Sequence, residues 1–352
     1  MSEEKPRRRS RPLRCEEPER LFFVTTRTLE ETFWLHPLLC SRVRPENREA
    51  RRVVDAKRLR LRTKLGRIVA RANRRRPANQ PKLTMEEAEK LAADLVSSAL
   101  ARAQEHCAKD GLPPVEVFAA VVMSNHLHLV LRARGKNLAA FMGYFLARVA
   151  QSLNLLLGRV GPVFPRRYDA QPVLDEESAS GRIKYVLENP KKAGLVRCFT
   201  EWPGFVAVAG LHEGDVLETQ HFDRSAWQLA KRPVERARYW RRGRLHLSRL
   251  PGMESLSRSA YLATVKSWCD SRPAERCLGV EGVLEADVNQ RPKKPKHSRR
   301  PYAFGSPEQV DAYREATRLR HAAYDASRAL AKRGERVEWP EGMYAPGGAV
   351  AA

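Results

Sequence analysis

The sequence has few of the features that mark disulfide-rich, zinc-stabilised or membrane-spanning proteins. Its six cysteines are scattered, and none shares the CxxC spacing of a zinc ribbon with another: Cys15, Cys40, Cys107, Cys198, Cys269 and Cys277. No apolar run approaches the roughly 20 residues needed to span a bilayer, so we expect no membrane partner. Residues 1–14 are basic with no apolar stretch behind them, which argues against a secretory signal. We therefore expect reduced thiols in a cytoplasmic protein.

Acidic residues are also scarce relative to basic ones. The chain has 65 Lys and Arg against 41 Asp and Glu, a net charge of +24 over 352 residues. A surface of one sign repels itself unless it meets a polyanion, so nucleic acid is the favoured partner. A basic enzyme without such a partner, or one bound to acidic lipid, remains an alternative. Because apolar residues make up 42% of the chain, a substantial hydrophobic core is possible.

Four regions differ in composition and pattern. Residues 1–20 form a basic arm that we expect to be disordered until it meets phosphate. Residues 21–206 carry the readable strands and helices, interrupted at about 45–112 by an Arg-rich helical segment. Residues 207–352 are basic, and we expect them to be mostly helical. The clearest helix there begins at a capping box, Ser306 to Gln309, and ends near Gly334.

Within 21–206, strands alternate with helices. We predict strands at 21–27, 115–123, 126–131 and 170–174. Helices are predicted to follow the capping box at Thr84, to follow Asn137, and to run from Asp175 to a stop at 189–190. Leu138, Phe141, Phe145, Val149, Leu153 and Leu156 recur at helical spacing as a core-facing stripe. The pattern indicates an α+β domain with one antiparallel sheet.

Two residue pairs carry possible chemistry. His126 and His128 lie two apart on a predicted strand, so their imidazoles share one face and could bind a single divalent metal ion. A bare HxH is common, and a half-exposed strand is the plainer interpretation. Tyr185 and Asn189 lie four apart on a predicted helix and share a face. Taken alone, that tyrosine is more typical of a core or rim residue.

The context of these pairs resembles the HUH endonuclease superfamily, in particular the REP-associated branch of the single-tyrosine transposases. The matching segments are 122–130 around the histidines, 153–154, 161–164, 166–169, and 185–196, which reads YVLENPKKAGLV. Residues 21–27 fit the opening strand of that family. The distance from this strand to His126 is longer than the family pattern, which marks the Arg-rich segment as an insertion. The region beyond Phe205 is unmatched.

The resemblance implies a fold, a reaction and roles for the four residues. The fold is a ferredoxin-like α/β sandwich with a central antiparallel sheet. Tyr185 matches the nucleophile, whereas His126, His128 and Asn189 match the ligands of a Mg²⁺ or Mn²⁺ ion. The implied activity is that of a transposase, a site-specific nuclease that cuts and rejoins single-stranded or hairpin DNA through a 5′-phosphotyrosine link. It implies no small-molecule cofactor, a monomer or homodimer, and a place in the bacterial cytoplasm on the nucleoid.

Basic and aromatic side chains flank these motifs in the sequence. Arg132, Arg134, Arg166 and Arg167 could follow a single-stranded backbone, with Tyr168 or Phe164 as a stacking platform. A solvated basic surface explains the same arginines equally well. The cluster from Arg236 to Arg244 fits sequence-independent phosphate contacts. Two other functions stay open: a hairpin-binding protein of the same descent that does not cut, and an unrelated metallohydrolase that needs no tyrosine.

Overall fold

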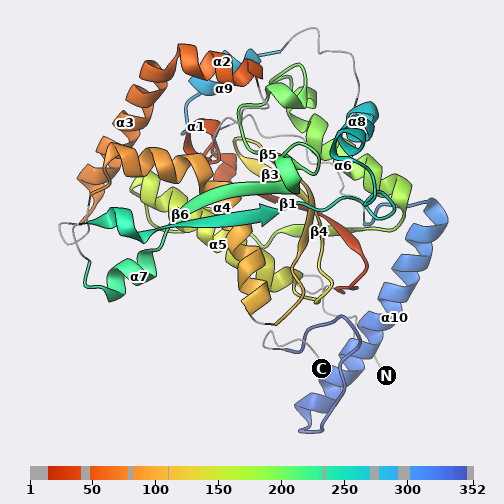
Figure 1. The fold of residues 1–352 in the computed structure, drawn as a ribbon. Coiled ribbons are helices and arrows are strands. Elements are labelled where there is room, and N and C mark those ends of the chain that lie inside the picture. Colours follow the sequence, from red (N-terminus) through yellow and green to blue (C-terminus); the bar gives the residue numbers. More distant parts are fainter. Residues whose placement is uncertain are drawn as a thin grey trace.

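A computed structural model describes residues 15–40, 48–77, 82–109, 111–232, 235–269, 277–291 and 302–346. Its centre is a five-stranded antiparallel sheet with the strand order β4-β1-β3-β2-β5 (Figure 1). The strands are β1 (Leu21–Arg27), β2 (Glu116–Val122), β3 (His126–Arg132), β4 (Asp169–Val173) and β5 (Val206–Val208). The first four follow the chain order β-α-β-β-α-β of a ferredoxin-like fold, so the predicted α+β class is confirmed.

One face of the sheet carries a helical layer. The helices α4 (Met85–Lys109) and α5 (Leu138–Leu157) pack against each other, and α3 (Arg58–Arg75) lies outside them. The predicted apolar stripe of α5 is fully buried and shares one core with Leu127, Leu129 and Leu131 of β3. Alternation in a strand places those leucines on the face opposite to the histidines. Burial of large apolar side chains, at about 1.5–3 kcal/mol each, stabilises this layer.

The composition of α5 corrects one expectation. Among the described residues, this 20-residue helix is long and apolar enough to cross a membrane by those two criteria alone. In the fold, its residues Phe141, Phe145 and Val149 are buried against the protein core. The apolar character of α5 is therefore explained by its packing against α3 and α4 and by the core that it shares with β3.

The other face of the sheet is covered by α6 (Glu176–Lys192), which packs against β2 and β3. The Asp175 side chain caps it by accepting a hydrogen bond from the Ser178 N–H at 2.6 Å. The predicted stop at 189–190 is wrong, because α6 continues to Lys192. A proline so close to the end removes a single backbone bond, and the Ala193 N–H still donates to the Asn189 carbonyl oxygen at 3.0 Å. Gly194, with φ +67°, ends the helix in the left-handed region.

The N-terminal arm has a structured end. Residues 1–14 lie outside the described residues, whereas Cys15 and Glu16 are buried, so the expected disorder up to residue 20 is wrong for the last part of the arm. A carboxylate oxygen of Glu16 accepts a hydrogen bond from the Leu138 N–H at 2.9 Å and so caps α5. Asn137 occupies the expected cap position, but its side chain donates to the carbonyl oxygen of Pro113 instead.

The Arg-rich insertion and the C-terminal region each add helices around this core. The segment predicted as an insertion, about 45–112, contains α2 (Arg48–Ala56), α3 and α4, but α4 is the first helix of the ferredoxin-like order, so only α2 and α3 are additional; a short α1 (Pro37–Cys40) precedes them. The C-terminal region contains α7 (Arg224–Leu229), α8 (Arg258–Trp268), α9 (Gly279–Glu285) and α10 (Pro307–Lys332). The predicted helical C-terminal region is thus confirmed, and α10 begins at the predicted capping box. This region also contains an unpredicted hairpin of β6 (Val216–Phe222) and β7 (Trp240–His246), which packs on α4.

Two connections bind the C-terminal region to the sheet domain. At the start of β2, the Ser248 N–H donates to the Val117 carbonyl oxygen at 2.8 Å. Further along, Phe304 forms a parallel bridge to Val173 at the outer edge of β4, and the Leu174 N–H donates to the Phe304 carbonyl oxygen at 2.7 Å. The extension therefore supplies side chains to the face of the sheet that α6 covers.

Candidate active site

His126 and His128 lie on the α6 side of β3, as their spacing predicts. Their ring centroids are 4.9 Å apart, with an angle of 81° between the ring planes. Phe23 on the neighbouring strand β1 stacks on the His128 ring, with centroids 5.3 Å apart. Because His128 is opposite Thr25 in the sheet register, both rings stand on the rigid central pair of strands. The imidazole positions are therefore fixed by backbone pairing and by a buried aromatic ring.

Tyr185 and Asn189 on α6 approach the same two histidines. The Asn189 Oδ1 atom lies 3.4 Å from His126 Nε2. The Tyr185 ring is edge-on to the His128 ring at a centroid distance of 5.6 Å, and edge-on to Phe23 at the same distance. Tyr185 and Asn189 are half-buried rather than enclosed in the core. The structure therefore brings the four sequence-predicted residues together at one place between β3 and α6.

The proton of His126 can be assigned from its contacts. Its Nδ1 atom lies 2.6 Å from the Asn125 side-chain oxygen, a distance that requires a hydrogen between them. A neutral imidazole has one N–H group, so we assign it to Nδ1, which donates to Asn125. The lone pair on Nε2 then faces the amide oxygen of Asn189 at 3.4 Å. Two electron-pair donors that face each other in this way suit a shared cation.

His126 is held neutral. Burial and, second, the nearby guanidinium of Arg27 lower the pKa of its imidazole, the contact with Asn189 opposes them, and the result is a pKa of about 4. A neutral imidazole is the form that binds a metal ion. Within the described part of the chain, no group of three or more His, Cys, Asp or Glu side chains is placed to bind a metal. A cation at this site would therefore depend on two imidazoles and an amide oxygen, a donor set that suits a divalent ion.

Sequence reasoning missed the cation beside the tyrosine. The guanidinium carbon of Arg182 lies 5.2 Å from the Tyr185 ring centroid and 4.1 Å from that of Phe304. The Lys192 ammonium lies 5.2 Å from the Tyr185 ring on the same helix. Arg182 precedes Tyr185 by three residues, so helical spacing alone could have identified it. Phe304 could not have been identified, because it is distant in the sequence and reaches the site through the edge of β4.

The predicted DNA-contacting arginines fall into two groups. Arg132 and Arg134 lie at the other end of β3 from His126, about 20 Å along the strand by its usual rise. The buried Arg132 guanidinium pairs with Glu116 at 2.6 Å, and Arg134 pairs with Glu19 at 2.6 Å. These ion pairs explain both side chains structurally, so their predicted contact with DNA stays a prediction without support from the geometry.

The second group lies nearer to the histidines. Arg166 and Arg167 are exposed in the loop before β4, and β4 enters the sheet where Asp169 pairs with Thr25. Thr25 in turn pairs with His128, so the loop adjoins the histidine end of the sheet. Tyr168 is only 5% exposed, which leaves no ring face for the suggested base stacking. Phe164 is half-buried and remains the accessible aromatic ring of this loop.

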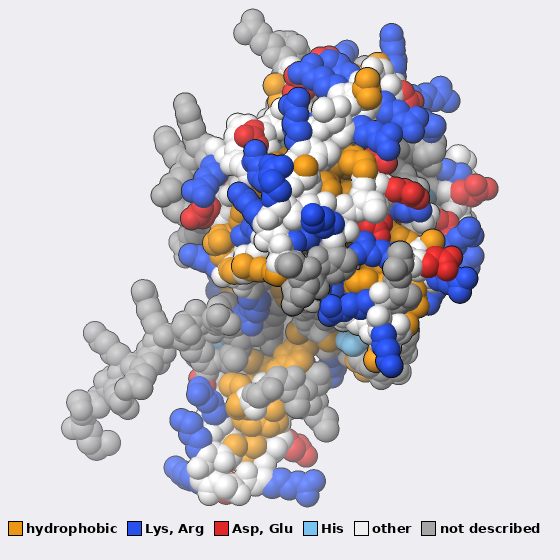
Figure 2. Space-filling model, turned by 90° about the vertical axis from the view of Figure 1, so that its left-hand side faces the viewer, with side chains coloured by type: hydrophobic (Ala, Val, Ile, Leu, Met, Phe, Trp, Pro, Cys, Tyr) orange, Lys and Arg blue, Asp and Glu red, His pale blue; other side chains and the backbone are white. Residues whose placement is uncertain are grey.

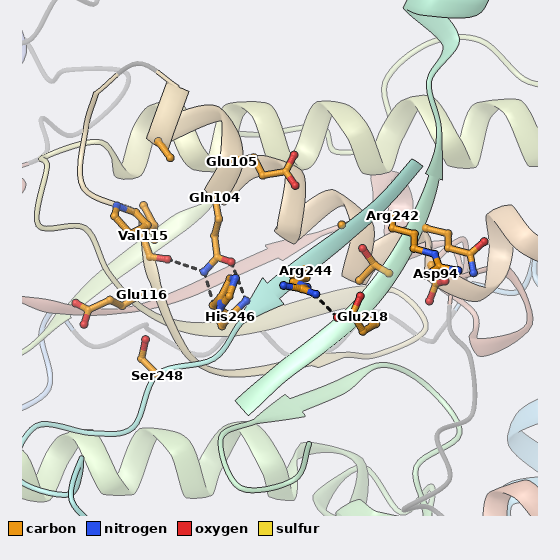
Figure 3. A pocket seen from close by; sticks show the side chains of 15 residues that line it. Asp94, Gln104, Glu105, Val115, Glu116, Glu218, Arg242, Arg244, His246 and Ser248 are labelled. Carbon is orange, nitrogen blue, oxygen red and sulfur yellow. Dashed lines mark hydrogen bonds and ion pairs between the residues drawn. The ribbon is translucent and has the colours of Figure 1, made fainter. Parts of the chain in front are cut away.

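A cavity of about 880 Å³ lies elsewhere, between α4 and the β6–β7 hairpin (Figure 3). There the Gln104 amide donates to the carbonyl oxygens of Val115 at 2.9 Å and His246 at 3.0 Å, and accepts from the His246 N–H. Arg244 pairs with Glu218 across the hairpin at 2.9 Å. The polar groups of this cavity hold the hairpin on α4. Arg242 and Arg244 of the predicted phosphate-contacting cluster line it, whereas the predicted nucleophile and metal ligands do not.

Comparisons with known proteins add little to this geometry. No model of a protein family and no curated protein matches the chain. A solved structure of a REP-associated tyrosine transposase bound to a REP hairpin aligns with 56% of this chain and 81% of its own length. The TM-score is 0.31 and the sequence identity is 13%. A similarity of this size supports no functional argument, so the function must be argued from the site itself.

Proposed function

We propose that this protein is a metal-dependent, single-stranded DNA endonuclease and strand transferase of the transposase type, with Tyr185 as its nucleophile. The observation that carries the proposal is the convergence of two elements. β3 supplies His126 and His128, and α6 supplies Asn189 at 3.4 Å from His126 Nε2 and Tyr185 at 5.6 Å from the His128 ring. A phenol beside a set of neutral metal ligands is what phosphodiester transfer to tyrosine requires.

The two histidines and Asn189 would hold a Mg²⁺ or Mn²⁺ ion. When bound, such an ion polarises the scissile phosphate and stabilises the charge that develops on its oxygens. Asn125 contributes by holding the proton of His126 on Nδ1, which leaves Nε2 free as a donor. All three ligands are neutral, so the site keeps its positive charge for a polyanionic substrate.

In the proposed reaction the Tyr185 hydroxyl oxygen attacks a backbone phosphorus atom. The bond between phosphorus and the 3′ oxygen breaks, the tyrosine O–P bond forms, and the phenolic proton passes to solvent. The departing 3′ oxygen takes up a proton and leaves as a free hydroxyl. The 5′-phosphotyrosine link conserves the phosphodiester energy, so attack by another 3′ hydroxyl rejoins the strand. A tyrosine hydroxyl is a weak nucleophile unless a nearby group activates it, and the cationic side chains of Arg182 and Lys192 flank the ring of Tyr185.

The proposed substrate is single-stranded or hairpin DNA of palindromic sequence. The net charge of +24 and the exposed Arg166 and Arg167 beside the histidine end of the sheet favour a polyanionic backbone. The choice of hairpin DNA, and a place on the nucleoid in the cytoplasm, rest on the sequence motifs between 122 and 196.

The test uses end-labelled hairpin DNA with Mn²⁺ and detects a denaturation-resistant protein–DNA adduct. We expect an adduct with the native protein and none with Tyr185→Phe, which keeps the ring and removes the hydroxyl. Tyr144→Phe on α5 removes a hydroxyl elsewhere and should leave the adduct unchanged. Binding without an adduct in the native protein would indicate a non-cleaving hairpin-binding protein. Hydrolysis that survives in Tyr185→Phe would indicate a metallohydrolase.

A further inference from the structure

Helix α3 carries a stripe of arginines on its outer side. Arg67, Arg71 and Arg74 follow the spacing i, i+4, i+7 and are all exposed. The opposite side of the helix is buried, through the apolar residues Leu61, Leu65, Val69 and Ala72. At 1.5 Å per residue the stripe runs about 10 Å along the helix axis. Its three guanidinium groups therefore form one linear array of positive charge.

This array lacks compensating negative charge. Within the described part of the chain, no carboxylate pairs with Arg67, Arg71 or Arg74, whereas Arg60 and Arg62 nearer the start of α3 pair with Glu285 and Glu89. Like charges one turn apart on a helix repel each other, so the stripe does not stabilise α3 by itself. Figure 2 views the molecule from the side on which α3 and α7 lie in Figure 1, and Lys and Arg side chains predominate over Asp and Glu there.

The C-terminal end of α3 adjoins a cavity of about 500 Å³. The Asn73 side chain donates to the Leu83 carbonyl oxygen at 2.9 Å and accepts from the Leu83 N–H at 3.0 Å. The residues on either side of Leu83 belong to the cavity wall, which combines aromatic, basic and acidic side chains: Lys82, Thr84, Glu86, Glu87, Lys90, Trp227, Arg232, Arg236, Ala237 and Trp240.

Trp240 is the accessible ring of this cavity. It is half-buried at the start of β7, while Trp227 is only 6% exposed. Lys90 lies 5.8 Å from the Trp240 ring centroid and Arg236 lies 5.1 Å from that of Trp227. Basic side chains also lie between the cavity and α3. Burial and the guanidinium groups of Arg236 and Arg224 lower the pKa of Arg76, whereas Glu87, which pairs with Arg236 at 2.6 Å, opposes this effect.

We propose that the α3 stripe and the Trp240 cavity form one binding surface for single-stranded nucleic acid, separate from the Tyr185 site. The stripe (Arg67, Arg71 and Arg74) contacts consecutive phosphates, and Trp240 stacks on an unpaired base. The surface lies on the helical side of the sheet, opposite to the side that α6 covers, so it holds a part of the strand that is not being cut. The proposal goes beyond the cleavage chemistry and does not depend on it.

The mixture of groups favours a single strand over other anionic partners. An array of charges alone would also suit a duplex or an acidic membrane surface. The aromatic ring at the end of the array adds a contact that only an unpaired base can make, because bases in a duplex are already stacked. An acidic lipid surface offers nothing to a recessed indole in a cavity whose walls also carry Glu86 and Glu87.

The test measures binding of a fluorescent oligo(dT) of about 20 nucleotides, which cannot form a hairpin. Replacing the stripe by Arg67→Gln, Arg71→Gln and Arg74→Gln should weaken binding at least 10-fold near physiological salt. It should also lower the slope of log K against log salt by about 2, as expected for three lost phosphate contacts on a single strand. Trp240→Ala should weaken binding about 10-fold, and Trp240→Phe should restore most of it because a ring remains for stacking.

The controls distinguish an effect of this surface from a general effect of net charge and from an effect on the Tyr185 site. A triple Gln variant of Arg328, Lys332 and Arg336, all exposed at the far end of α10, removes the same charge and should retain the affinity and salt slope. Equal losses in the two triple variants, or none in the stripe variant, would overturn the proposal. So would loss of binding to phosphatidylserine vesicles without loss of oligo(dT) binding. Oligo(dT) binding is measured without metal, so failure to form a Tyr185 adduct would not affect it.

Discussion

The guanidinium group of Arg182 is held against the ring of Tyr185, with its carbon 5.2 Å from the ring centroid, and no carboxylate in the described structure neutralises it. Phe304 from the C-terminal region lies on its other side at 4.1 Å. Burial lowers the pKa of Arg182, while its interaction with Tyr185 opposes that effect. A half-buried cation without an anionic partner favours a bound phosphate beside it.

Arg182 should therefore matter for the reaction of Tyr185 more than for folding. We expect Arg182→Gln to slow formation of the tyrosine–DNA adduct by about 10–100-fold, since loss of one preorganised charge donor has effects of this order or larger. Arg182→Lys keeps the charge and should recover part of the rate. The measurement is a single-turnover rate at saturating hairpin DNA, so that weaker DNA binding does not affect the measured rate.

The matched control is Lys184→Gln, which removes a positive charge from the same helix next to Tyr185 in sequence. It should change the single-turnover rate less than about two-fold, within the range of a screened surface charge. If Lys184→Gln slows the reaction as much as Arg182→Gln does, the effect is one of general electrostatics. If Arg182→Lys is as slow as Arg182→Gln, the guanidinium acts through its shape and aromatic contacts.

A second prediction concerns metal affinity. His126→Ala and His128→Ala should each abolish measurable Mn²⁺ binding in a calorimetric titration, because each removes one of the three proposed protein ligands. Asn125→Ala removes no ligand but releases the proton held on His126 Nδ1. Loss of such an orienting partner weakens metal binding by about 10–100-fold.

The control for metal binding is His246→Ala, an exposed histidine on β7. It should leave the Mn²⁺ titration unchanged. A titration that persists in His126→Ala and His128→Ala would place the metal elsewhere. An Asn125→Ala variant that binds Mn²⁺ as tightly as the native protein would show that the Nδ1 contact does not orient the ring for binding.

The strands and helices of the sheet domain could be predicted because the local sequence of each one favours the structure that it adopts. β1 was predicted at its observed bounds, and the capping box at Thr84 forms, with the Glu87 N–H donating to the Thr84 hydroxyl at 3.2 Å. Strand alternation also placed His126 and His128 on one face. The geometry that links β3 to α6 is long-range, so the sequence could only suggest it through motif resemblance.

What the sequence did not reveal depends on contacts between distant segments. Glu16 caps α5 across more than a hundred residues, and no local pattern around Asn137 could indicate that. The β6–β7 hairpin was missed because β7 (Trp240–His246) is so rich in arginine that its alternation reads as a basic surface segment. Arg132 was considered as a possible DNA contact because a sequence does not show that Glu116 lies beside it.

The insertion and the C-terminal region are joined at the end of α9. The Lys64 ammonium on α3 donates to the carbonyl oxygens of Leu284, Glu285 and Ala286 at 3.0, 3.0 and 2.7 Å. These carbonyls belong to the last turn and C-cap of α9, where a cation is favourable and the oxygens lack helical partners. Lys64→Met keeps the apolar stem and should lower the free energy of unfolding by about 1–2 kcal/mol.

Urea denaturation at neutral pH checks this prediction. Arg58→Met is the control, because it removes a charge from an exposed position on the same helix without a contact to α9. It should change the free energy of unfolding by less than about 0.5 kcal/mol. Equal shifts in the two variants would mean that the charge of α3, rather than the cap on α9, determines stability.

The same helix α9 gives rise to a pH dependence through His36. The fully buried ring of His36 accepts a hydrogen bond from the Leu38 N–H on Nδ1 at 3.1 Å, and its Nε2 contacts the Val283 carbonyl oxygen at 2.9 Å. An acceptor on one nitrogen and a donor on the other define a neutral ring. Burial and the positive charge of Lys64 lower its pKa, the Val283 contact and the carboxylate of Asp287 oppose them, and the pKa falls from 6.5 to about 4.

The folded state thus binds the His36 proton more weakly than the unfolded state does. Between about pH 6.5 and 4 the unfolded chain is protonated first, so stability should fall as the pH is lowered through this range. The full effect of His36 is about 3 kcal/mol, present above pH 6.5 and lost near pH 4. His126 has a similarly lowered pKa, so the native protein alone does not isolate the contribution of His36.

His36→Gln isolates it, because an amide can replace part of the hydrogen bonding but cannot titrate. We expect the variant to be less stable than the native protein at pH 7, and the difference to shrink as the pH approaches 4. Urea denaturation of both proteins at intervals between pH 7 and 4 provides the comparison. A difference that stays constant over the range would mean that His36 does not change protonation on unfolding. A difference that grows at low pH would mean that His36 is charged in the folded protein, contrary to its contacts with Leu38 and Val283.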